Sequence, residues 1–299
     1  KVFVFMKFWQ KYQKAIIKRL IALAVMVLLV AYSYMLRSVD YDYISGKVVL
    51  GERYALSENP NKQHMTIALI TDLHACYYGD NQQTLIKALN KHKPDVILLG
   101  GDIYDDRQPF DNADKLLAQL PSIAPTYYVD GNHENWLPSA KYQDVLQRVT
   151  AHGVTVLHGK SVQLPDSNVY IHGVADPNSG HFEQDLQAVT QHLNPDDVNI
   201  LLSHRPELID TYRHYDFDVM LSGHAHGGQW RLPLLINGLY APGQGIFPKY
   251  AGGVYSFENG KTLIVSRGLA RESTKVPRIF NRPELVFLTL SDKESAELF

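Results

Sequence analysis

Five short apolar runs, each followed within three residues by an Asp or His, constrain the fold of this chain more than any other feature. The runs are Met65–Thr71, Val96–Leu99, Thr126–Val129, Val198–Leu202 and Val219–Leu221. Their β-branched content is typical of strands buried on both faces of a sheet. Amphipathic stretches with helical periodicity lie between them, at Gln82–His92, Asp111–Leu120, Ser139–His152 and Glu183–His192. This alternation predicts one compact α/β domain.

Further strands are expected outside these five runs. Val154–Leu157 and Val169–Val174 are apolar and rich in β-branched residues. Residues 253–257 and 262–266 flank an Asn-Gly dipeptide, which is typical of a tight hairpin turn. A closing strand is expected at Glu284–Leu290.

Polar side chains gather where the five apolar runs end. The carboxyl ends of strands in an α/β sheet are where ligand sites form, so residues far apart in sequence can meet there. In Asp72-x-His74 and His224-x-His226 the middle residue points away, which leaves two side chains on one side of an extended strand. The candidate metal ligands at these ends are Asp72, His74, Asp102, Asn132, His204, His224 and His226.

The donor types restrict the metal and the reaction. Cys76 is the single cysteine, so nitrogen and oxygen must hold any metal, and imidazole with carboxylate suits Mn, Fe or Zn. Seven ligands exceed what one ion usually takes from a protein, and a pair of ions sharing one carboxylate fits the number. Two such ions clamp the attacking and leaving oxygens at phosphorus and turn a bound water into the nucleophile. The pattern therefore predicts hydrolysis of a phosphate ester or anhydride with two divalent metal ions.

The motifs, in their order along the chain, resemble those of the calcineurin-like metallophosphoesterases. They are Asp72-x-His74, Gly101-Asp102-x-x-Asp105, Gly131-Asn132-His133-Glu134, His204 and Gly223-His224-x-His226. The likeness covers about residues 48–290 and is greatest to a bacterial membrane-associated branch, with GHAHGGQ at 223–229 and NRPELVFLTL at 281–290. The resemblance implies a four-layer α/β/β/α sandwich over residues 48–299, in which helices cover two β-sheets on both outer sides.

The resemblance also implies a role for each motif residue. One metal would be held by Asp72, His74 and His226, the other by Asn132, His204 and His224, with Asp102 bridging the two. His133 would be the catalytic general acid that protonates the leaving oxygen. Asp105 would orient the His133 imidazole, because a general acid needs its second ring nitrogen fixed.

One position departs from the family pattern. Protein Ser/Thr phosphatases of this superfamily place an Arg directly after the second Asp of the second motif, where this chain has Asp106. We therefore do not expect a guanidinium clamp on the phosphate from this motif, which argues against a phosphoprotein substrate. Arg205 and Arg267 are candidates to compensate, although a surface or structural role is the more common one for such arginines.

The first 40 residues differ from the rest in charge. They hold seven cations and one anion, against 22 and 30 in the remainder. Residues 20–36 carry no charge and would span roughly 25 Å as a helix, the short end of a membrane crossing. A transmembrane signal anchor at 20–36, in the cell (inner) membrane, would keep the basic segment 1–19 in the cytoplasm. The catalytic domain would follow a linker at 37–47 and lie on the extracytoplasmic side of that membrane. A cleaved signal peptide is the alternative.

Charge and apolar patterning also bear on partners. The chain has 29 basic and 31 acidic residues and so lacks the basic footprint of a nucleic-acid binder. The expected partners are the membrane and a phosphoester substrate, with a lipid or envelope component among the candidates, because apolar residues between Trp230 and Phe247 follow the last motif. Two other functions stay open. They are a lipid-precursor pyrophosphatase, similar to the UDP-2,3-diacylglucosamine hydrolases, and a catalytically silent metal-binding scaffold.

Overall fold

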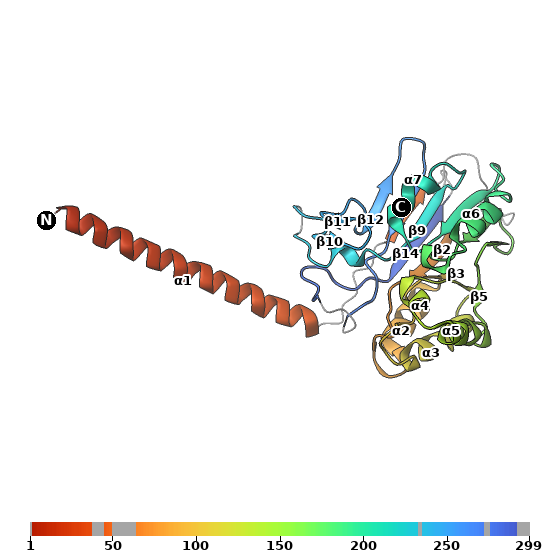
Figure 1. Ribbon diagram of the computed structural model, residues 1–299, viewed down its shortest axis with the longest axis horizontal. Helices are drawn as coiled ribbons and strands as arrows, with labels where there is room; N and C mark the ends of the chain where they lie inside the picture. The colour runs from red at the N-terminus through yellow and green to blue at the C-terminus, as the bar shows by residue number, and fades with distance from the viewer. Residues whose placement is uncertain (1, 38–44, 50–63, 233–234, 272–275, 292–299) are drawn as a thin grey trace. The chain divides into compact units, whose positions relative to one another are not determined.

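The computed structural model describes residues 2–37, 45–49, 64–232, 235–271 and 276–291 (Figure 1). The chain divides into two compact units, 1–40 and 41–299. Most of the predicted linker, residues 38–44, lies outside the described residues.

The first unit contains one long helix, α1 (Val2–Arg37). It encloses the uncharged run 20–36, in which the described apolar side chains between Leu20 and Leu29 are about half exposed. Arg19 precedes this run and Arg37 follows it, so only seventeen consecutive residues lack charge. No helix in the described part of the chain is long and apolar enough to cross a membrane, and the predicted transmembrane anchor is therefore not supported.

The second unit is built on two six-stranded sheets. The first sheet has the order β1-β14-β2-β3-β4-β5, and all neighbours are parallel except β14 and β2. Its strands are β1 (Ser45–Val49), β14 (Val286–Ser291), β2 (His64–Ile70), β3 (Val96–Gly100), β4 (Thr126–Val129) and β5 (Thr155–Val156). Since β2, β3 and β4 are parallel neighbours, their carboxyl ends lie at one edge of the sheet.

The second sheet has the order β12-β13-β9-β8-β7-β6. Its two outer pairs are antiparallel and its inner pairs are parallel. The strands are β12 (Gly253–Ser256), β13 (Thr262–Val265), β9 (Val219–Ser222), β8 (Val198–Leu202), β7 (Val169–Gly173) and β6 (Lys160–Gln163). Strands β12 and β13 form the hairpin predicted around Asn-Gly, and a separate small pair is formed by β10 (Tyr240–Ala241) and β11 (Gly245–Ile246).

Three apolar clusters show how the layers pack. Alternate strand residues, such as Ile67 of β2 and Ile200 of β8, meet in a cluster between the two sheets. Their neighbours face outward, so that Ala68 packs under helices on one side and Leu201 under helices on the other. The first group of helices is α2 (Gln83–His92), α3 (Asp111–Leu117) and α5 (Ser139–Ala151), and the second is α6 (Phe182–Thr190) and α7 (Ile209–Tyr212) (Figure 1). The period-two pattern of the strands thus produces a helix, sheet, sheet, helix arrangement.

The predicted α/β class with two large sheets is confirmed, with shifts at element ends. The helix expected at Asp111–Leu120 stops at Leu117 and is followed by a 3-10 turn, Leu120–Ser122, whose Pro121 has no N–H to donate. Strand β6 and the one-turn helices α4 (Asn132–Asn135) and α7 were not predicted. They are short, and β6 is a polar edge strand, so neither carries a strong periodic pattern.

Candidate active site

The predicted ligands all lie within four residues of the carboxyl end of a strand in one of the two sheets. Asp72 and His74 follow β2, Asp102 follows β3, and Asn132 opens α4 just after β4. On the second sheet His204 follows β8, and His224 and His226 follow β9. Each of these residues is at most 7% exposed, so the site is built of polar groups taken out of water.

The backbone is strained at most of these positions. Five of the seven have φ between 48° and 65°, namely Asp72, His74, Asp102, His224 and His226. This left-handed region costs an L residue roughly 1–2 kcal/mol. Such clustered strain is typical of functional sites, where surrounding contacts hold the residues in place.

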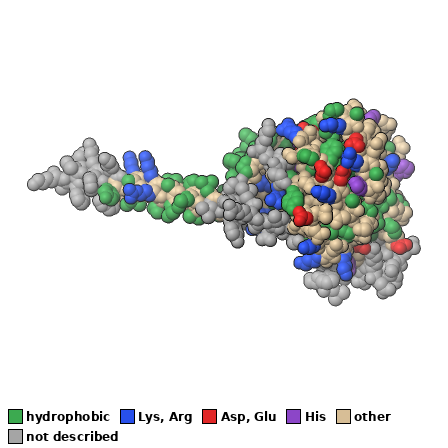
Figure 2. Space-filling model, turned by 90° about the horizontal axis from the view of Figure 1, so that it is seen from below, with side chains coloured by type: hydrophobic (Ala, Val, Ile, Leu, Met, Phe, Trp, Pro, Cys, Tyr) green, Lys and Arg blue, Asp and Glu red, His purple; other side chains and the backbone are tan. Residues whose placement is uncertain are grey.

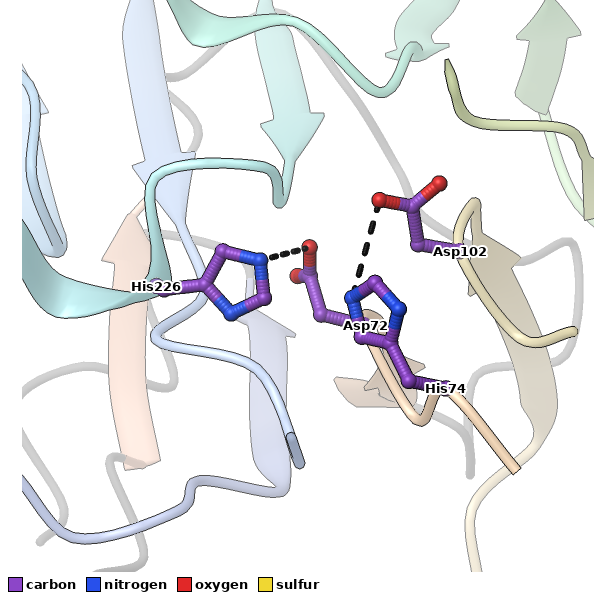
Figure 3. Close-up of side chains that lie close together, drawn as sticks. All are labelled: Asp72, His74, Asp102 and His226. Atoms are coloured by element: carbon purple, nitrogen blue, oxygen red, sulfur yellow. Dashed lines mark ion pairs between the residues drawn. The ribbon is translucent and has the colours of Figure 1, made fainter. Parts of the chain in front are cut away.

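One group of side chains comes from both sheets. The potential ligand atoms of Asp72, His74, Asp102 and His226 all lie within 4.8 Å of one another, and Figure 3 shows the four side chains pointing toward a common space. His226 Nε2 is 3.6 Å from Asp72 Oδ1, and His74 Nε2 is 3.7 Å from Asp102 Oδ2.

A second group shares Asp102 with the first. The potential ligand atoms of Asp102, His204 and His224 also lie within 4.8 Å of one another. His204 Nε2 is 3.2 Å from Asp102 Oδ2 and 3.2 Å from His224 Nδ1. The structure thus brings together six of the predicted ligands as two groups with one carboxylate in common.

Unpartnered buried atoms test whether these residues fit a metal. His74 Nε2, Asp102 Oδ2 and Asn132 Oδ1 are buried and have no hydrogen-bond partner. A buried polar atom without a partner costs about 1–3 kcal/mol, so a compensating ligand is needed. Each is an atom type that binds Mn, Fe or Zn, and the residues present therefore fit divalent metal ions.

Electrostatics place three of the candidate ligands, His224, His226 and Asp102, in their metal-binding forms. Burial, reinforced for His224 by His204 and for His226 by His74, lowers the pKa of both imidazoles well below the ordinary value and keeps them neutral. Burial alone would raise the pKa of Asp102, but His204 and His74 outweigh it and hold that pKa well below its usual range. Neutral imidazole and ionised carboxylate are the forms that coordinate metals. For the other two candidate ligands whose pKa is shifted, burial is outweighed by the charge of Asp102, which raises the pKa of His204 to about 10, and burial raises the pKa of Asp72.

Neighbouring groups fix the orientation of two ligand rings. His74 Nδ1 is 2.8 Å from Asp105 Oδ2, and His204 Nδ1 is 2.8 Å from the carbonyl oxygen of Gly100. With Nδ1 held by these acceptors, Nε2 of each ring faces the site and is the atom available to a metal. Contacts of this kind set the tautomer and raise the basicity of a ligating histidine.

His133 lies beside both carboxylates of the second motif. Its Nδ1 is 2.7 Å from Asp106 Oδ1 and 3.4 Å from Asp105 Oδ2. Burial favours the neutral ring, but the hydrogen bonds to Asp105 and Asp106 and the charges of Asp102 and Asp105 raise the pKa of His133 to about 9. The contact with Asp106 was not foreseen, although its position directly after Asp105 in sequence is a signal that could have suggested it.

Glu134 is a further residue whose part the sequence did not reveal. Its buried carboxylate accepts four backbone N–H bonds, from Asp102 and Gly131 at Oε2 and from Ile103 and Tyr104 at Oε1, at 2.8–3.0 Å. These bonds hold the loops after β3 and β4 together. No local sequence pattern indicates these hydrogen bonds to Glu134, because three of the donors lie about thirty residues away in the sequence.

The two arginines proposed to compensate for Asp106 are engaged elsewhere. Arg205 donates to both oxygens of Asp176, at 2.5 and 3.0 Å, and lies 3.4 Å from Glu207. Arg267 forms an ion pair with Glu284 at 3.1 Å. Both side chains thus have carboxylate partners within the protein.

Comparison with known proteins identifies the family. The family model for calcineurin-like phosphoesterases matches residues 65–228, more than half of the chain, and includes every ligand described above. The chain belongs to the calcineurin-like phosphoesterase family. It is therefore a metal-dependent phosphoester hydrolase, which argues against the silent scaffold.

Relatives within the calcineurin-like phosphoesterase family match most of the chain. The uncharacterised protein YpbG of Bacillus subtilis is 28% identical over 261 residues, 85% of this chain and 92% of the relative. The uncharacterised metallophosphoesterase YkuE of the same organism is 30% identical, over 75% of this chain and 78% of its own. Phosphodiesterase YaeI of Escherichia coli is 29% identical, over 67% of this chain and 72% of its own.

Proposed function

We propose that the second unit is a dinuclear phosphoesterase that hydrolyses phosphate mono- or diesters. The observation that carries this proposal is the position of Asp102, whose carboxylate belongs to both ligand groups and has an unpartnered buried oxygen. Asp72, His74 and His226 would hold one ion and Asn132, His204 and His224 the other. Bound divalent ions would supply Lewis acidity at the phosphoryl group and lower the pKa of the attacking water.

His133 is the group in this site best placed to protonate the leaving oxygen. It is partly exposed, with a side chain that is 22% accessible, whereas the ligand side chains are 9% or less. Its ring lies 4.4 Å from that of His74, which puts it beside the first ligand group. Asp105 and Asp106 hold Nδ1 and so leave Nε2 free to carry the proton that is transferred.

The carboxylate of Asp106 supports diesters as the preferred class. A diester carries one negative charge near neutral pH and a monoester carries close to two. Repulsion from a fixed carboxylate beside the site is therefore greater for a monoester. The name of the Escherichia coli relative, a phosphodiesterase, supports the same preference.

The test is hydrolysis of p-nitrophenyl phosphate and bis-p-nitrophenyl phosphate after chelation and after adding back Mn, Zn, Fe or Mg singly. We expect metal-dependent turnover, greater for the diester, that falls at least 100-fold in Asp102→Asn because the shared ligand is lost. Turnover that survives full chelation, or that Asp102→Asn leaves unchanged, contradicts the proposal.

Exposed apolar side chains beside the site favour a lipid phosphoester as a second candidate substrate. Trp230, Leu235, Ile246 and Phe247 are 41–78% exposed. Phe247 N donates to the carbonyl oxygen of Leu239, and Leu239 N donates to that of Gly228, so this segment is tied closely to the loop of His226. Leu234, one of the apolar residues between Trp230 and Phe247, lies outside the described residues.

Two substitutions test whether the substrate is a lipid phosphoester rather than a soluble one. Trp230→Ser with Phe247→Ser should slow turnover of a lipid phosphoester in vesicles or micelles about tenfold, because the apolar contact with the acyl chain is lost. Turnover of the soluble chromogenic diester serves as the control and should stay the same. Equal losses on both substrates would contradict the lipid candidate.

A further inference from the structure

Two arginines flank the histidines that follow β9, and their surroundings differ. Arg205 Nη1 is 3.2 Å from His224 Nε2, and Arg278 Nη2 is 3.5 Å from His226 Nδ1. Arg205 is neutralised by Asp176 and Glu207, as described above. In the described part of the chain, no carboxylate forms an ion pair with Arg278.

Arg278 is buried with part of its guanidinium unused. The residue is 8% exposed, unlike the many Lys and Arg side chains that Figure 2 shows on the surface. Its Nη2 donates to the carbonyl oxygen of Gly268 at 3.3 Å, but Nε and Nη1 have no hydrogen-bond partner. A buried charge without a partner is strongly destabilising, so an anion is expected to neutralise it when the protein works.

The contact with His226 shows where Arg278 lies relative to the first ligand group. The ring of His226 turns Nε2 toward Asp72 Oδ1, at 3.6 Å, and Nδ1 toward Nη2 of Arg278, at 3.5 Å. The guanidinium therefore lies next to a candidate metal ligand, and an anion that it holds would lie close to the first ligand group.

We propose that Arg278 binds the phosphoryl oxygens of the substrate, next to the first ligand group. The proposal rests on the proposed function and adds to it a binding residue from outside the matched motifs. A guanidinium presents a planar fork of donors that matches two phosphate oxygens, and Nε and Nη1 of Arg278 are such donors without partners. Arg278 thereby supplies a positive charge for the phosphoryl group. The second motif lacks such a charge, because Asp106 stands where the protein Ser/Thr phosphatases have an Arg.

Kinetics and anion binding of the metal-loaded full chain test this role. We expect Arg278→Met to raise KM for bis-p-nitrophenyl phosphate, and the inhibition constant of inorganic phosphate, about 10- to 100-fold. The number of metal ions per chain should stay the same, since Arg278 offers no ligand atom. Arg278→Lys should recover part of the loss, because it restores the charge but not the fork.

Arg148→Met is the matched control. Arg148 pairs with Asp114 and Asp144 on the surface, with a side chain that is 40% exposed, so its loss should alter neither KM nor phosphate inhibition. If Arg278→Met unfolds or loses metal, Arg278→Lys is compared with the wild type alone and should still show weaker phosphate inhibition.

Two results separate this proposal from the proposed function. Unchanged phosphate inhibition in folded, metal-loaded Arg278 variants overturns the role of Arg278 while the proposed function stands. A wild-type protein without turnover on any ester contradicts the proposed function. Calorimetric binding of inorganic phosphate to the wild type and to Arg278→Met then still decides the role of Arg278, with equal affinities overturning it.

Discussion

At the residue scale, the two carboxylates beside His133 have different neighbours and should have different effects. Asp106 contacts the imidazole at 2.7 Å, whereas Asp105 also receives the Nδ1–H of His74. We expect Asp106→Asn to slow hydrolysis of esters with poor leaving groups about 10- to 100-fold and to affect p-nitrophenyl esters less, because only poor leaving groups need a proton. A series of aryl diesters of increasing leaving-group pKa measures this.

Asp105→Asn is the comparison for that prediction. It disturbs His74 as well as His133, so we expect it to weaken metal binding and to slow all esters alike. A flat dependence on leaving group in Asp106→Asn, equal to that of Asp105→Asn, would contradict separate roles for the two carboxylates.

The residues of the site were predictable from sequence to an unequal degree. The clustering of the Asp and His candidates was predictable, because the ends of neighbouring strands bring such side chains together, and their role as metal ligands stays a prediction. Glu134 and Arg278 could not be assigned a role from sequence, because the groups that they contact belong to segments far away in the chain. The assignment of His133 as general acid stays a prediction.

At the scale of elements, the turn after β13 packs against Asp72, a predicted metal ligand. Gly268 has φ 70°, and a Cβ added there would lie 2.5 Å from Cβ of Asp72. We therefore expect Gly268→Ala to displace Asp72 and to weaken binding of at least one metal ion tenfold or more. Competition with a fluorescent chelator measures the affinity.

Gly260→Ala is the matched control for this prediction. Gly260 has φ 81° in the hairpin turn, and a Cβ there would meet no atom within 4 Å. Both changes place Ala in the left-handed region, at a cost of roughly 1–2 kcal/mol in the free energy of unfolding. Equal metal affinities of the two variants would show that Gly268 matters only for its backbone conformation.

The elements that sequence predicted well are the buried ones. Strands β2, β3, β8 and β9 are continuous apolar runs, and their composition alone marks them. Strand β6 was missed because it is an exposed edge that gains its structure by pairing with β7. The anchor was predicted from the uncharged run in α1, whose seventeen residues are few for a crossing.

At the scale of the whole molecule, His172 makes stability depend on pH. The residue is fully buried in the second sheet, between Ser161 Oγ at 2.7 Å and Asn199 Oδ1 at 3.0 Å. Burial lowers the pKa of His172 to about 4. Between pH 6.5 and 4 the unfolded chain therefore binds more protons, and stability is lost as pH falls through this range.

The measurement is denaturation of the chelated protein at pH 7 and pH 5. From the lowered pKa, His172 should cost the wild type about 2 kcal/mol of unfolding free energy between these pH values. His172→Gln keeps polar contacts without titrating, so its loss should be smaller by that amount. Equal losses in the two proteins would mean that His172 titrates normally in the folded state.

The strand order of the whole molecule could not be predicted from sequence. β14, near the end of the described chain, lies between β1 and β2 in the first sheet. The pairing of β14 with β2 joins residues about 220 positions apart, for example Val286 with Leu69. Local patterns identify a strand and its buried face, but such long-range partners depend on how both sheets pack.

The proposed dinuclear site depends on Asp102, whose carboxylate would join the two ions. The most direct test is to load the chelated protein with Mn²⁺, count the ions per chain by elemental analysis and record the electron paramagnetic resonance spectrum. We expect two ions per chain with the signal of an exchange-coupled pair, and loss of that coupling in Asp102→Asn. One ion per chain in a fully active wild type, or two ions without coupling, would contradict the proposed site.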